Sequence, residues 1–192
     1  MPDREVESIR DLLYYQYAKI MAKSAFRTDD GQAAKRQHYG FIKETLRALK
    51  NGKKTWSEIT REDKQLVEKE KKCFYCGSED DLQWEHIVPK SIRIKCKCST
   101  CHTIQAIHNM IRACKSCNLA KRTMGLYEFF KAKYPDDTKF YDRIPPLLEK
   151  KYLKTIWNCH ECAGTLDVGD LDGDGRITVL DIDQILHRST TS

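Results

Sequence analysis

The sequence has no long hydrophobic run. No stretch approaches the roughly 18 consecutive apolar residues that a membrane helix requires. The N-terminal segment, MPDREVESIR, is charged and lacks the apolar core of a secretory signal peptide. We therefore expect a cytoplasmic protein without a membrane partner.

The cysteines do not fit a scheme in which all of them form disulfides. Their number is nine, so any such scheme leaves one unpaired. Several fall in CxxC pairs, and in a chain without a visible signal peptide this spacing favours metal binding over disulfides. We therefore interpret the cysteines as a metal-ligand framework.

The charge is unevenly distributed along the chain. The 34 basic and 28 acidic side chains give a net charge of +6, but residues 164–192 hold six Asp and only two Arg. The remainder, residues 1–163, therefore carries 32 basic and 22 acidic side chains. A basic body favours a polyanionic partner, most often nucleic acid, although a Lys-rich solvated surface would have the same composition.

Hydrophobic periodicity predicts a mainly helical chain with a small β region. We expect helices at 3–27, 32–50, 61–71, 118–132 and 145–157, with short strands and loops over 74–112. A chain of 192 residues can bury one sizeable core with small appendages. The prediction is an α+β fold with four segments: a helical region at 1–72, a core at 73–134, a helical extension at 135–163 and a tail at 164–192.

Two CxxC knuckles enclose the predicted core. Cys73 and Cys76 form the first, and Cys114 and Cys117 form the second. Four thiolates at this spacing suit tetrahedral zinc in a closed site, which is structural because no position stays open for chemistry. The alternative is two unrelated thiol pairs.

Five polar residues and one proline follow in a characteristic order between and after the knuckles: Glu85, His86, Pro89, Asn109, Asn118 and Lys121. His86 lies ten residues after Cys76, Asn109 lies five before Cys114, and Asn118 directly follows Cys117. Over residues 73–122 this arrangement resembles the zinc-stapled form of the HNH endonuclease family.

The resemblance implies a ββα-metal core that hydrolyses phosphodiester bonds in DNA. His86 would be the general base, since an imidazole can accept a proton from water near neutral pH. Glu85 and Asn118 would be the oxygen ligands of one Mg²⁺ or Mn²⁺. Asn109 would hold the hairpin loop in place, and the products would carry 5′-phosphate and 3′-hydroxyl ends.

Basic residues near this motif are expected to contact DNA phosphates: Arg112, Lys115, Lys121 and Arg122. Taken singly, each could equally be ordinary surface charge. The helices before residue 72 could give target specificity, form a homodimer or brace the core.

Two further CxxC pairs suggest a second zinc site. Cys98 and Cys101 lie inside the predicted core, whereas Cys159 and Cys162 lie beyond it. Together they would clip the C-terminal extension onto the hairpin insert. Cys96, His102 or His160 could replace one of these ligands, and an isolated thiol pair is the alternative.

The acidic tail contains a calcium-loop pattern, DLDGDGRITVLD, at 170–181. Oxygen donors fall at the loop positions that ligate Ca²⁺ in such loops: Asp170, Asp172, Asp174, the carbonyl of Arg176, and Asp181. The pattern resembles a single dockerin-type or EF-hand-like repeat. A solvated acidic turn is the alternative.

Two other functions remain open from the sequence. One is a zinc-stapled nucleic-acid-binding module whose HNH site is inert. The other is an interaction protein in which the calcium loop is the functional part.

Overall fold

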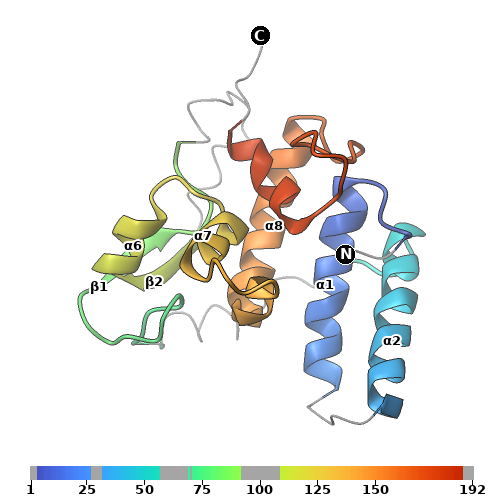
Figure 1. Cartoon of the computed structure of the whole chain (residues 1–192), viewed down its shortest axis with the longest axis horizontal. Coiled ribbons are helices and arrows are strands. Elements are labelled where there is room, and N and C mark those ends of the chain that lie inside the picture. The colour runs from blue at the N-terminus through green and yellow to red at the C-terminus, as the bar shows by residue number, and fades with distance from the viewer. Residues whose placement is uncertain (1–3, 27–31, 57–68, 70, 92–108, 188–192) are drawn as a thin grey trace.

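The chain has a mixed α+β fold in which helices predominate (Figure 1), seen here in a computed structural model. The structure describes residues 4–26, 32–56, 69, 71–91 and 109–187. Its elements are α1 (Ile9–Ala25), α2 (Gln32–Lys50), β1 (Leu82–His86), β2 (Met110–Cys114), α6 (Lys115–Lys121), α7 (Leu126–Lys133), η3 (Phe140–Arg143), α8 (Pro146–Cys162) and η4 (Val179–Leu186). No helix of this described part is long and apolar enough to cross a membrane.

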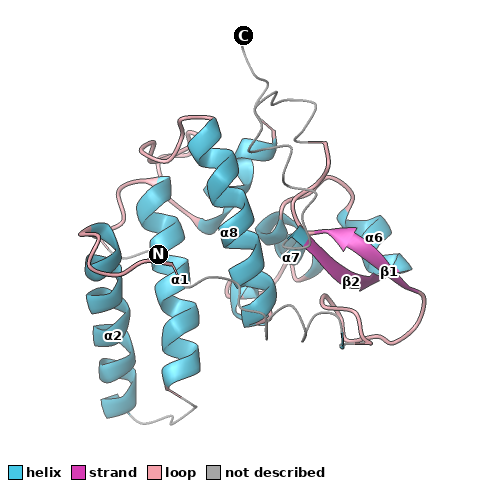
Figure 2. Ribbon diagram, turned by 180° about the vertical axis from the view of Figure 1, so that it is seen from behind, coloured by secondary structure: helices cyan, strands magenta, loops and turns pink. Residues whose placement is uncertain are grey.

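A two-stranded antiparallel hairpin followed directly by a helix forms one side of the molecule (Figure 2). The register pairs Trp84 with Arg112 and His86 with Met110. Asn109, which precedes β2, accepts a hydrogen bond from the Val88 N–H at 2.8 Å and donates one to the Val88 carbonyl at 2.9 Å. These buried bonds fix the segment after β1 against the start of β2.

The helical side is built from α1, α2 and α8. Ser8 caps α1 by accepting a hydrogen bond from the Asp11 N–H. Buried Leu12, Leu13 and Leu46 join the same hydrophobic core as the hairpin and α7. α1 packs against α8, and Lys151 of α8 donates a hydrogen bond to the Met110 carbonyl of β2 at 2.9 Å.

Residues 164–187, the described part of the acidic tail, are bound into this core. The carbonyls of Leu166 and Val168 accept hydrogen bonds from the first turn of α1, each at 2.8 Å. Ile182 of η4 is fully buried, and its carbonyl accepts a hydrogen bond from His160 Nε2 at 3.0 Å. Residues from both ends of the sequence thus close around the same core (Figure 1).

Several predicted helix boundaries differ from the structure. α1 begins at Ile9 rather than near residue 3, because Ser8 supplies the cap. The helix expected at 118–132 is two helices, since Arg122 adopts a positive φ of 50° and Gly125 is the N-cap residue of α7. α8 continues beyond residue 157 to Cys162, and the helix expected at 61–71 lies almost entirely outside the described residues.

Candidate metal centre and active-site pocket

Four cysteine thiols from the two knuckles converge on one point. The Sγ atoms of Cys73, Cys76, Cys114 and Cys117 all lie within 4.8 Å of one another. The Cys76 and Cys114 sulfurs are 3.7 Å apart, close to the ~3.8 Å edge of a sulfur tetrahedron around zinc with 2.3 Å bonds. The cluster could hold a zinc ion.

The backbone of each knuckle supports this arrangement. Gly77 has a φ of 80° and donates its N–H to the Cys73 carbonyl, which closes the first knuckle. Burial raises the pKa of Cys114, but hydrogen bonds from Ser116 and the neighbouring thiols outweigh it and lower this pKa to about 6. Lys133 Nζ lies 3.8 Å from the Cys117 sulfur. Burial, by contrast, raises the pKa of Cys73 and of Cys117. Cys114 is therefore the thiol of this cluster that most readily supplies thiolate, the form that binds zinc.

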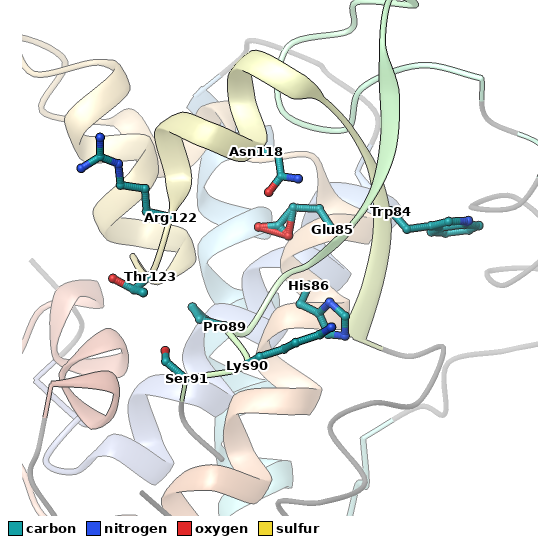
Figure 3. Close-up of a pocket in the computed structure, with 9 residues that line it drawn as sticks. All are labelled: Trp84, Glu85, His86, Pro89, Lys90, Ser91, Asn118, Arg122 and Thr123. Carbon is teal, nitrogen blue, oxygen red and sulfur yellow. The ribbon is translucent and has the colours of Figure 1, made fainter. Parts of the chain in front are cut away.

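A pocket of about 340 Å³ lies beside this cluster, between β1, the segment after it and α6 (Figure 3). Glu85 and Asn118 line it from opposite elements. Asn118 donates its amide N–H to Gln83 Oε1 at 3.2 Å, and Figure 3 shows its oxygen turned toward the Glu85 carboxylate. Two oxygen donors thus face one another, which fits the small number of protein ligands that Mg²⁺ uses.

Glu85 already has a cationic partner. Lys121 Nζ lies 3.0 Å from Glu85 Oε1 and also donates to the His86 carbonyl at 3.2 Å. Burial raises the pKa of Glu85 and lowers that of Lys121, and the attraction within the pair opposes both shifts. The carboxylate is therefore partly neutralised before any metal binds.

This position corrects the expectation that Lys121 contacts phosphate. Its side chain is 0 % exposed, because α6 packs this face onto β1. The sequence placed Lys121 one turn into a helix but could not show which face of the helix is buried.

His86 and Trp84 project from the opposite side of β1 to Glu85 (Figure 3). Successive side chains on a strand alternate between its two faces, so residues two positions apart lie on the same face. Both border the pocket, and His86 is half-buried whereas Trp84 is exposed. Sequence reasoning missed Trp84, although its place two residues before the histidine in a predicted strand was a usable signal.

The other predicted phosphate contacts lie at or near the surface. Lys115 and Arg122 are exposed on and after α6, and Arg122 lines the pocket. The guanidinium of Arg112 lies 4.0 Å from the centre of the Trp84 ring.

In the acidic tail, Asp170, Asp172 and Asp174 offer carboxylate oxygens within 4.8 Å of one another. Asp181, the last carboxylate of the predicted calcium loop, is outside this group. It is buried and accepts hydrogen bonds from the N–H groups of Leu171 and Thr178, each at 2.7 Å. Arg176, whose carbonyl was the fourth predicted ligand, donates its own N–H to Asp174.

The predicted second zinc site is only partly within the described residues. Cys159 is buried and Cys162 is exposed at the end of α8, whereas Cys96, Cys98, Cys101 and His102 lie outside the described part of the chain. His160 is fully buried, and its ring nitrogens contact Thr165 Oγ1 and the Ile182 carbonyl. Both nitrogens are thus engaged within the protein, which argues against His160 as a zinc ligand.

Comparison with protein-family models, with curated proteins and with solved structures gives no match to this chain.

Proposed function

We propose that the protein is a metal-dependent endonuclease of the HNH type that hydrolyses phosphodiester bonds in DNA through a ββα-metal site. The observation that carries this proposal is one pocket, bordered by Glu85, His86 and Asn118, on a hairpin and helix beside a four-thiol cluster. The basic composition of the chain before the tail suits a polyanionic substrate.

Each side chain has a distinct role in this proposal. His86 accepts the proton of the attacking water. Asn109 is a positioning residue, because its two bonds to Val88 hold the turn that follows His86. Arg122 and Lys115 bind the phosphate backbone without reading sequence.

Three kinds of metal are proposed, with different roles. Zinc on the four thiols is structural. Glu85 and Asn118 would hold Mg²⁺ or Mn²⁺, which when bound stabilises negative charge on the phosphate and the leaving oxygen. Lys121 competes for Glu85, so this ion is expected to bind weakly until substrate supplies further oxygens. Ca²⁺ is proposed for Asp170, Asp172 and Asp174 as a brace of the tail.

The Glu85–Lys121 ion pair favours a second candidate function. A lysine that neutralises the metal-binding carboxylate is also what an inert nucleic-acid-binding module would tolerate. Such a module would bind DNA through the same basic surface and leave it intact.

Nicking of supercoiled plasmid separates the two functions. Purified full-length protein is incubated with plasmid in EDTA, Mg²⁺, Mn²⁺ or Ca²⁺, beside His86→Ala and the control Ser91→Ala, which alters the same pocket without removing a proposed catalytic group. A nuclease cuts in Mg²⁺ or Mn²⁺, loses cutting in His86→Ala and retains it in the control. Binding without cutting under every condition identifies the inert module.

A further inference from the structure

Trp84 is an unusually exposed aromatic residue at the edge of the pocket. Its side chain is 41 % exposed, although Trp normally buries most of its surface. The other two tryptophans pack into the protein, with the Trp56 and Trp157 rings 5.4 Å apart. Trp84 is thus the tryptophan that can meet a ligand.

Arg112 gives this indole a charged support. The two residues pair directly across the hairpin, and the guanidinium lies over one face of the ring at 4.0 Å from its centre. A cation on one face of an aromatic ring leaves the other available for a planar partner. Arg112 also adds positive charge where a nucleic-acid backbone would pass.

We propose that Trp84, backed by Arg112, is a stacking site for an unpaired nucleobase, so that the nuclease acts on single-stranded or locally unpaired DNA. The part of this inference that concerns where the DNA is cut rests on the proposed nuclease function. Trp84 and His86 share one face of β1, about 6.6 Å apart along the strand. A nucleotide whose base stacks on Trp84 would therefore place a neighbouring phosphate near His86.

The requirement for an unpaired base follows from geometry. Bases in an intact duplex lie 3.4 Å apart along each strand, so a neighbouring base covers each face. A side chain fixed on a hairpin can stack only on a base whose face is free, as in a single strand or an unstacked step. Lys90 and Arg122, both exposed on the pocket rim, would hold the flanking phosphates.

The test measures binding separately from cleavage. Full-length protein carrying His86→Ala is titrated in Mg²⁺ with a fluorescent oligothymidylate and with a blunt duplex of equal length. The same titrations are made after adding Trp84→Ala, Trp84→Phe or Leu119→Ala. Leu119 is a matched control because it is a large apolar side chain of neighbouring α6 that is 64 % exposed.

Loss of one stacked base should weaken single-strand binding by about tenfold or more in Trp84→Ala. Duplex affinity should change by less than about threefold, because duplex binding depends mainly on phosphate contacts. Trp84→Phe should retain most of the single-strand affinity, and Leu119→Ala should match the parent. The oligothymidylate should also quench tryptophan fluorescence in the parent and not in Trp84→Phe.

Equal losses for both DNA forms, or no loss for either, would overturn the stacking site. Misfolding of Trp84→Ala would also weaken the binding of both DNA forms equally. In that case the fluorescence of Trp84→Phe decides: if there is no stacking site, the oligothymidylate quenches this variant as much as the parent. If the binding results are as expected but the protein never nicks plasmid, the stacking site stands and the proposed nuclease function is wrong. If the protein nicks plasmid but the binding results differ from those expected, only the stacking site is wrong.

Discussion

The Asp183 carboxylate occupies the place that an N-cap side chain of α7 would take, above Gly125. Gly125 is the N-cap residue and has no side chain, and a Cβ added to it would overlap the Asp183 carboxyl group. Asp183 Oδ2 instead accepts the hydrogen bond from the Glu128 N–H at 2.8 Å, and Tyr152 donates to its other oxygen. A residue of η4 thus caps a helix more than fifty positions earlier in the sequence.

Gly125→Ala should therefore destabilise the protein. The added methyl group displaces the capping carboxylate, and overpacking of this kind costs about 1–3 kcal/mol. Gly40→Ala is the matched control, because Gly40 lies within α2 with no atom within 4 Å of the added Cβ. The control should gain about 0.5–1 kcal/mol from helix propensity. Urea unfolding measures the free energy of unfolding of both variants, and equal effects of the two substitutions would contradict the capping role of Asp183.

Asp183 should also make stability depend on pH. Burial raises its pKa to about 7, against the opposing hydrogen bond from Tyr152. The unfolded chain loses this proton near pH 4 and the folded chain near pH 7, so stability falls as pH rises between the two. The loss approaches about 4 kcal/mol for three pKa units.

Asp183→Asn removes this titration. Its unfolding free energy relative to the parent should rise steadily between pH 4.5 and 7.5, as measured by urea unfolding at several pH values. Asp136→Asn, at an exposed position, is the control and should track the parent. Parallel curves for the parent and Asp183→Asn would show that this carboxyl group does not titrate in the window.

The capping contact illustrates what the sequence could and could not predict. Local rules predicted α2 at 32–50, short strands within 74–112 and the convergence of four cysteines, because periodicity and ligand spacing are local properties. Nothing local indicates that Asp183 caps α7 or that Lys121 turns inward to Glu85. Those contacts depend on how distant elements pack, which propensity does not encode.

The calcium-loop motif shows the same limit. Asp170, Asp172 and Asp174 follow one another at intervals of two residues in the pattern, and their carboxylate oxygens lie within 4.8 Å of one another. The pattern also assigned Asp181 to the ion, whereas packing of η4 directs this carboxylate to backbone N–H groups. The spacing of a motif specifies candidate donors, but tertiary contacts decide which of them remain available.

Lys121→Met should cost far more stability than a surface substitution. It removes one partner of a buried ion pair and leaves Glu85 uncompensated, which costs about 3–5 kcal/mol. The double variant Glu85→Gln/Lys121→Met should recover most of this loss, because no buried charge then remains. Arg122→Met is the matched control, since Arg122 is the next residue and is exposed. If Lys121→Met unfolds at the same urea concentration as the control, the pair is not buried in solution.

Zinc content should distinguish one metal centre from two. The four-thiol cluster accounts for one zinc ion per chain, which Cys76→Ser should remove. The second site predicted from the sequence would raise the ratio to two, and Cys162→Ser would then remove the second ion. Elemental analysis of the purified proteins measures the ratio. A ratio near one that Cys162→Ser leaves unchanged would eliminate the second site and retain the four-thiol centre.

Calcium should stabilise the whole chain, because the acidic loop is joined to the core. Slight burial and repulsion from Asp181 and Asp174 raise the pKa of Asp172, and a bound cation would relieve that repulsion. At one hundred times its dissociation constant, Ca²⁺ adds about 2.7 kcal/mol, or about 5–10 °C in melting temperature for a chain of this size.

Differential scanning calorimetry with and without Ca²⁺ measures this shift. Asp172→Asn should abolish it, whereas Asp167→Asn should retain it, because Asp167 is a neighbouring acidic residue that pairs with Arg10 outside the cluster. Mg²⁺ should give a smaller shift, since it demands a more regular ligand geometry than this loop provides. If Ca²⁺ shifts the parent and Asp172→Asn equally, its effect arises elsewhere and the loop is a solvated turn.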